Sequence, residues 1–134
     1  MDRRKESRIK GLIKLLFLSI ALLVVSCKHM PKPLDIGLEH QVYLAINDSS
    51  MQEEVIDQLM TLKQVEGVEA VEVFSRLDVG DERALDYDLL LRVYFKDEKA
   101  LAQYDSDSLH QSVRNQLKPH LSKPPLTFDL RFQD

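Results

Sequence analysis

Four segments of alternating apolar and polar residues constrain most strongly what this 134-residue chain can fold into. Alternation with a period of two residues is typical of strands that bury one face. The predicted strands span residues 40–46, 68–77, 87–95 and 126–132. In the last of these, four apolar residues alternate with Thr127, Asp129 and Arg131. The pattern predicts a sheet with one face turned to a core.

Helix-capping residues lie between these strands. Their side chains can accept hydrogen bonds from the free backbone N–H groups of the first helical turn. The predicted starts are Ser50 with Glu53, then Asp97, then Ser108 with Gln111. The element order is therefore β-α-β-β-α-α-β. This order predicts an α+β fold of ferredoxin-like type, in which an antiparallel sheet carries its helices on one face.

The other face of the predicted sheet is more apolar than a solvent-facing sheet should be. Phe74, Leu90 and Tyr94 lie on the side away from the helices. Single exposed apolar residues are common on protein surfaces. Three apolar residues on one sheet face indicate that a second copy of the chain covers this face. We therefore expect a homodimer.

The chain holds one cysteine, Cys27, which follows a basic stretch and an apolar run over residues 15–25. The basic residues are Arg3, Arg4, Lys5, Arg8, Lys10 and Lys14. The run is shorter than the ~20 residues that span a bilayer. Val24-Val25-Ser26-Cys27 has the pattern of a bacterial lipobox. The sequence predicts that residues 1–26 are a cleaved signal and that Cys27 is the lipidated N-terminus.

Two other interpretations of this segment stay open: an uncleaved membrane anchor with Lys14 at the interface, and a secretory signal in which Cys27 is incidental. Lipidation is favoured because a lone free thiol is a liability in an oxidising compartment. Several acyl chains, palmitate among them, also give stable attachment where one is marginal. Residues 27–38 would then form a lipidated tether, and residues 39–134 one small domain. We expect a cell-envelope location, in the outer membrane if the cell is Gram-negative, since Lys28 follows the cysteine.

The charge of the chain without its signal argues against nucleic-acid binding. Residues 1–26 hold six of the 18 basic residues and two of the 22 acidic residues, so the remainder holds 12 basic and 20 acidic residues. The resulting net charge of −8 would repel a phosphate backbone.

Several short segments, in this order and spacing, resemble the stress-responsive A/B barrel (Dabb) domains. They are His40-Gln41-Val42, Gly67-Val68, Tyr87-Asp88, Phe95-Lys96-Asp97-Glu98-Lys99-Ala100-Leu101, Tyr104, His110 and Phe128-Asp129-Leu130. The family often has a His-Pro pair where this chain has Ser106-Asp107-Ser108-Leu109. The resemblance covers most of residues 39–132 and implies a dimeric α+β barrel.

The resemblance also implies a site. A plant polyketide cyclase of the family is proposed to use a tyrosine and a histidine that match Tyr104 and His110, so these two are the candidate catalytic residues. The alternative is that both residues are structural: Tyr104 packs at the end of a short helix, and His110 forms hydrogen bonds with backbone groups of the turn over residues 105–108. His40, frequent at this place in the family, is a candidate ligand-binding residue, although such a histidine is more often packed or hydrogen-bonded.

No cofactor or metal is expected. The separations of His40, His110 and His120 match no compact metal-ligand motif, and the chain has no phosphate-binding loop, dinucleotide fingerprint or serine elbow. We predict a membrane-anchored protein that binds a small apolar molecule or has a stress or structural role in the envelope. The alternatives are a cofactor-independent cyclase or isomerase acting on an apolar keto or aromatic compound, and an interaction module whose partner binds the acidic helical face.

Overall fold

The computed structural model describes residues 34–133, so the predicted signal, lipobox and Cys27 lie outside the described residues. The elements in chain order are β1 (Leu38–Leu44), the 3-10 turn η2 (Ser49–Met51), α2 (Gln52–Met60), η3 (Thr61–Gln64), β2 (Val68–Ser75), β3 (Leu89–Phe95), α3 (Glu98–Ser106), α4 (Ser108–Leu117), η4 (Lys118–His120) and β4 (Leu126–Arg131). The predicted order of strands and helices is confirmed. No helix within residues 34–133 is long and apolar enough to cross a bilayer.

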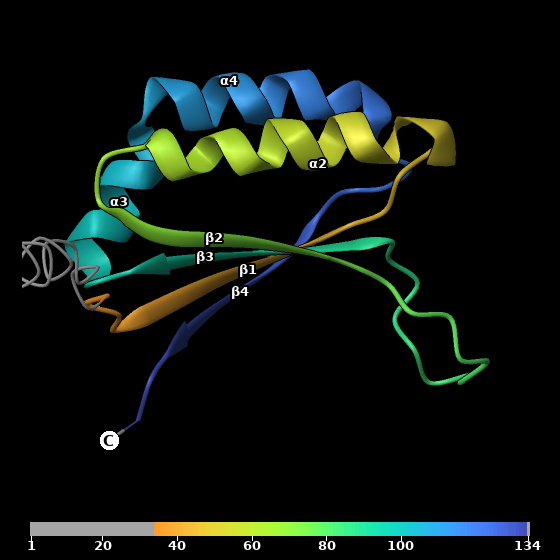
Figure 1. Ribbon diagram of the computed structural model, residues 1–134, viewed down its shortest axis with the longest axis horizontal. Coiled ribbons are helices and arrows are strands. Elements are labelled where there is room, and N and C mark those ends of the chain that lie inside the picture. Colours follow the sequence, from red (N-terminus) through yellow and green to blue (C-terminus); the bar gives the residue numbers. More distant parts are fainter. Residues whose placement is uncertain (1–33, 134) are drawn as a thin grey trace, which may run out of the picture. The chain divides into compact units, whose positions relative to one another are not determined.

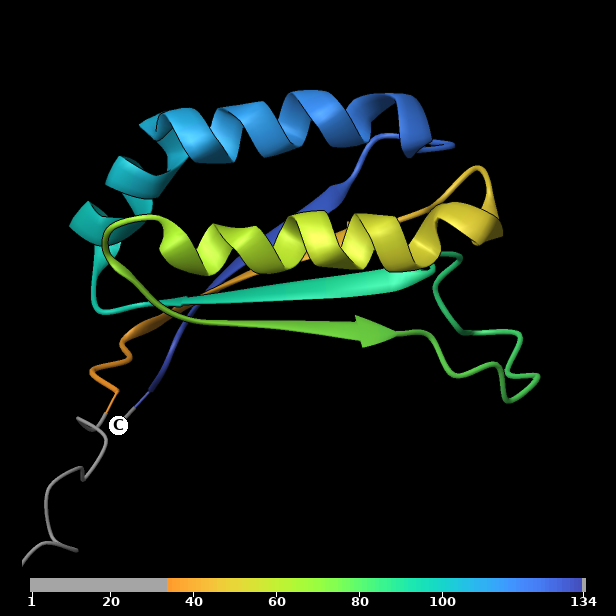
Figure 2. The same ribbon diagram turned by 45° about the horizontal axis from the view of Figure 1, so that its top comes forward.

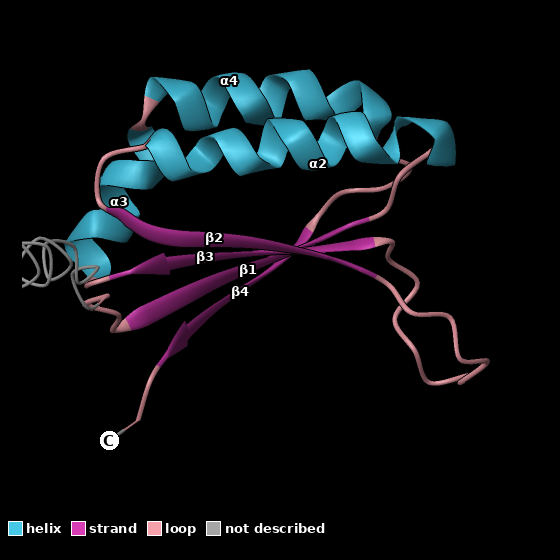
Figure 3. Ribbon diagram, in the orientation of Figure 1, coloured by secondary structure: helices cyan, strands magenta, loops and turns pink. Residues whose placement is uncertain are grey.

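The four strands form one antiparallel sheet in the order β2-β3-β1-β4. The helices of residues 34–133 lie on the same face of this sheet, and α2 and α4 run side by side across it (Figures 1 and 3). This arrangement confirms the predicted ferredoxin-like α+β fold. It places β1 between β3 and β4, so the first strand of the chain carries the centre of the site described below.

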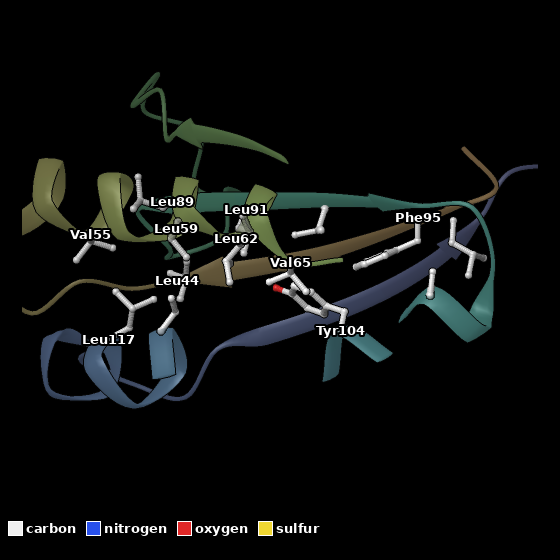
Figure 4. Close-up of a cluster of buried hydrophobic side chains, with 14 residues drawn as sticks. Leu44, Val55, Leu59, Leu62, Val65, Leu89, Leu91, Phe95, Tyr104 and Leu117 are labelled. Carbon is white, nitrogen blue, oxygen red and sulfur yellow. The ribbon is translucent and has the colours of Figure 1, made fainter. Parts of the chain in front are cut away.

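The hydrophobic core lies between the sheet and the helices. Its largest fully buried side chains are Tyr104, Phe95, Leu59, Leu62, Leu89, Val55 and Val93. Figure 4 shows this cluster, with Tyr104 and Phe95 on the same layer as the leucines of α2 and η3. Every residue of this core lies within residues 38–121. The described part of the chain therefore carries a core of its own.

Two of the three predicted capping residues are wrong by one or two positions, for a common reason. Asp107, not Ser108, caps α4, because its carboxylate accepts hydrogen bonds from the N–H groups of Leu109 at 2.8 Å and His110 at 3.2 Å. Asp48, not Ser50, caps the turn η2 that leads into α2. In both places an aspartate stands just ahead of the serine and takes the capping role.

The third predicted start is correct. The carboxylate of Asp97 accepts a hydrogen bond from Ala100 N at 2.9 Å and begins α3. Since α3 leads directly to Tyr104, this cap sets the position of one candidate site residue.

The first strand begins and ends two residues earlier than predicted. Gly37 N donates a hydrogen bond to Phe95 O at 2.9 Å, so pairing with β3 starts as soon as the chain enters the sheet. A Cβ atom at Gly37 would lie 2.3 Å from Lys96 O, and only glycine permits this approach. Beyond Leu44, the carboxylate of Asp88 accepts a bond from Ile46 N at 2.6 Å, and Ile46 pairs in an isolated bridge with Leu121 instead of with β3.

The sheet face away from the helices carries exposed apolar side chains at both edges. These are Phe74 on β2, and Leu126, Phe128 and Leu130 on β4, followed by Phe132. Phe74 is where the sequence analysis placed it. The register sets Phe128 beside Gln41 and Leu130 beside Glu39, so the apolar strip of β4 adjoins the centre of the sheet.

The centre of this outer face holds a polar network. The guanidinium of Arg92 donates to both carboxylate oxygens of Glu39, at 2.5 and 3.0 Å, and this bond holds the pKa of Glu39 below its usual range. The Tyr94 hydroxyl donates to Glu72 at 2.7 Å, and burial together with this bond raises the pKa of Tyr94 to about 12. Every charged group of the network has a partner within it.

Candidate functional site

A cavity of about 790 Å³ lies between α4 and the sheet, on the side of β1 and β4. Its apolar lining includes Val42, Leu44, Leu59, Leu62, Leu91 and Val113. A volume of this size is typical of small-molecule sites, in which mostly apolar walls carry a few polar groups.

The sequence of β4 explains why the cavity is not filled. The helix-facing positions of β4 include Thr127 and Asp129, which line the cavity and offer no large apolar side chain for α4 to pack on. The large side chains of β4, Phe128 and Leu130, point to the opposite face. Strict alternation in one edge strand therefore leaves space on the helix side and an apolar strip on the other.

Tyr104 and His110 meet in the wall of this cavity. Their rings are stacked, with centroids 3.9 Å apart and an interplanar angle of 23°. Tyr104 is 1% exposed and also contacts the Phe95 ring edge-on at 5.1 Å. The short turn at Asp107 between α3 and α4 brings the two rings together, since they are only six residues apart along the chain.

The backbone fixes the protonation pattern of His110. Its Nδ1 lies 3.0 Å from Tyr104 O, and because a carbonyl oxygen only accepts, Nδ1 carries the proton. Neutral His110 then has its lone pair on Nε2. Burial, more than any other cause, lowers the pKa of His110 below its usual 6.5, so the ring is uncharged at neutral pH.

The Tyr104 hydroxyl makes no hydrogen bond with any residue in the described range 34–133. Burial raises the pKa of this phenol strongly, so it remains a proton donor. The cavity therefore presents one unoccupied donor, from Tyr104, and one unprotonated ring nitrogen, from His110. A molecule bound in the cavity would supply a partner for each of these two groups.

His40 lies in the same wall, on β1. Its Nδ1 is 2.6 Å from a carboxylate oxygen of Asp129, the residue directly opposite on β4. Its ring also contacts Tyr104, edge-on, at a centroid distance of 6.0 Å. All three predicted site residues, His40, Tyr104 and His110, thus line one cavity.

Sequence reasoning did not single out Asp129 as a site residue. It is 89 residues from His40 along the chain, and only the register of β1 against β4 places the two side by side. The signal in the sequence was the alternation of β4, which puts Asp129 on the face opposite Phe128.

His120 lies outside the cavity wall; its backbone oxygen accepts a hydrogen bond from Asn47 N at 3.0 Å. Within residues 34–133 no group of three or more His, Cys, Asp or Glu side chains is placed to hold a metal ion.

The buried state of His110 predicts a pH dependence of stability. The unfolded chain takes up a proton near the usual pKa of 6.5, whereas folded His110 does so only at lower pH. The unfolded state then binds more protons, so the free energy of unfolding falls as the pH is lowered from about 7 toward the folded pKa. Urea denaturation at about pH 7.5 and about pH 5.5 should show a smaller fall for His110→Asn than for the wild type. The same fall in both proteins would contradict a buried neutral His110.

A family model described as the stress responsive A/B barrel domain matches residues 38–129. No protein with a curated description is significantly similar to the chain in sequence.

Solved structures share the fold. A protein of Arabidopsis thaliana is 18% identical, with a TM-score of 0.64, over 72% of this chain and 96% of its own. A dimeric ferredoxin-like protein of unknown function from Thermobifida fusca is 16% identical, with a TM-score of 0.62, over 78% and 100%. A Dabb family protein from Mesorhizobium loti with a ferredoxin-like fold is 22% identical, with a TM-score of 0.56, over 72% and 97%.

Proposed function

The chain belongs to the stress responsive A/B barrel domain (Dabb) family, and on that premise we propose that it is a membrane-anchored, homodimeric protein that binds a small apolar molecule. The observation that carries the proposal is the cavity of about 790 Å³ lined by apolar side chains and by His40, Tyr104 and His110. A scaffold without a ligand would fill this space with its own side chains, because protein interiors are close-packed.

The polar groups of the cavity suit a ligand with one oxygen function on an apolar body. The Tyr104 hydroxyl can donate to a carbonyl oxygen, and neutral His110 can accept from a hydroxyl or an acidic C–H group. The lining includes several leucine and valine side chains, against which the apolar body of the ligand would pack. The wild type should therefore bind a long-chain alcohol such as decan-1-ol.

A second candidate function is proton transfer on such a ligand. One observation favours it: the uncharged His110 and the protonated Tyr104 are stacked at 3.9 Å, so a base and an acid face the same space. His110 would take a proton from carbon, and Tyr104 would donate a hydrogen bond to the carbonyl oxygen where negative charge develops. Cyclisation or isomerisation of a keto compound needs these two groups and no cofactor. A change in the mass or structure of the bound compound during incubation would separate catalysis from binding.

The homodimer is supported by the outer sheet face and by related structures. Apolar side chains on β4 and Phe74 on β2 flank a polar network in which each charge is paired. Proteins of the same fold from Thermobifida fusca and Bacteroides fragilis are described as dimeric. Packing the outer faces of two copies against each other would cover both apolar edges.

Membrane attachment is proposed at Cys27 and is tested by one substitution. Cys27→Ser removes the thiol that would carry the lipid, so the variant should leave the membrane fraction while the wild type stays in it. Ser26→Ala is the matched control, because the position before the cysteine accepts any small residue. Immunoblots of membrane and soluble fractions give the answer. A Cys27→Ser protein that stays with membranes would rule out lipid anchoring and favour the uncleaved anchor.

A further inference from the structure

The C-terminal half of α4 brings two cations to the cavity. Arg114 and Lys118 both line it, and they are four residues apart, so they project from the same side of the helix. His110, four residues before Arg114, lines the cavity as well. One side of α4 thus presents a histidine followed by two cations.

Neither cation has a partner within the described residues 34–133: no carboxylate there lies within ion-pair distance of Arg114 or Lys118. Like charges at this spacing repel each other. The negative end of the helix dipole favours cations near the end of α4, which accounts for their place along the helix but not for the side they occupy. Lys123, a third cation of the lining, is paired with Asp86 at 3.0 Å.

The cavity lining also holds two carboxylates. Asp129 is bonded to His40, and Asp105 follows Tyr104 directly in the chain. The apolar lining includes Leu44 and Leu117. From His110 to Lys118 the helix spans about 12 Å. Along α4 the cavity therefore presents His110, then Arg114 one turn later, and then Lys118 at the end of the helix.

From this arrangement we infer that the cavity takes an amphipathic anion: an apolar body that ends in a carboxylate, with the acid group held by Arg114 and Lys118. The inference rests on the proposed binding of a small apolar molecule and adds the class of its head group. A carboxylate would relieve the repulsion between the two cations and would accept charge-assisted hydrogen bonds from both. The apolar body would occupy the leucine-lined space toward Tyr104 and His110.

Two probes of the same chain length, decanoate and decan-1-ol, test the head group. Isothermal titration calorimetry on residues 28–134, which contain the complete core, should show decanoate binding about tenfold more tightly than decan-1-ol at low ionic strength. The Arg114→Gln/Lys118→Gln variant should lose this preference and keep its affinity for decan-1-ol, which also shows that it is folded. Lys63→Gln/Lys99→Gln removes the same charge away from the cavity and should keep the preference. The advantage of decanoate should shrink as salt is added.

Each failure has a different meaning. Equal binding of both probes by the wild type, or a preference that survives in Arg114→Gln/Lys118→Gln, would overturn the anion inference and leave the apolar cavity in place. Binding of neither probe by the wild type would overturn the proposed function, and the inference with it.

Discussion

Replacing Phe128 and Leu130 by aspartate is expected to convert the dimer into a monomer. Both side chains are about half exposed on the outer face of β4, with exposed fractions of 52% and 41%. In a two-fold dimer each substitution occurs twice, so four apolar contacts are lost. Burying the exposed half of each contributes about 0.75–1.5 kcal/mol, so the dimer should lose about 3–6 kcal/mol, or two to four orders of magnitude in Kd.

Sedimentation velocity over a range of protein concentrations measures this change directly. Ala102→Asp/Gln116→Asp is the matched control, because it adds the same two charges to exposed positions on the helices. The control should remain dimeric. A Phe128→Asp/Leu130→Asp protein that sediments as the wild type does would show that the outer sheet face is not the interface. The unfolding temperature of each variant shows whether the protomer is intact.

Filling the cavity is the second large effect that we expect. Val42 lies on the helix-facing side of β1 and lines the cavity. Val42→Trp would place an indole in the space that the ligand occupies and remove much of the apolar surface that it buries. A loss of about 3 kcal/mol of apolar contact weakens binding of decan-1-ol about 100-fold. Titration calorimetry with wild type and variant measures the ratio.

Val42→Ile is the matched control for this substitution. It adds one methylene at the same position and leaves most of the cavity open, so its affinity for decan-1-ol should stay within a few-fold of the wild type. Unchanged affinity in a folded Val42→Trp protein would mean that decan-1-ol binds elsewhere, and the cavity would lose its proposed role.

The fold was largely predictable because its signals are local. Strand alternation, the cap at Asp97 and the order of elements depend on residues close together in the chain, and the structure confirms them. The caps Asp48 and Asp107 were missed because two residues able to cap stand within one turn of each other, and spacing alone does not choose between them. The ends of β1 depend on Gly37 meeting Lys96 and on Asp88 meeting Ile46, which are distant contacts.

The candidate site was predictable only in part. Tyr104 and His110 are six residues apart, and their position in the family pattern singled them out before their stacking was seen. The pairing of His40 with Asp129 depends on strand register, which alternation does not set. The cavity itself arises from side chains that are absent on the helix side of β4, and a sequence pattern does not report empty space.

Native mass spectrometry of residues 28–134, purified gently from the source or a close host, tests the central claim most directly. We predict the mass of two protomers with additional small-molecule mass, and a dimer without that added mass for Val42→Trp. A wild type with no added mass after incubation with decan-1-ol would contradict ligand binding in the cavity. A monomer would contradict the dimer that the outer sheet face implies.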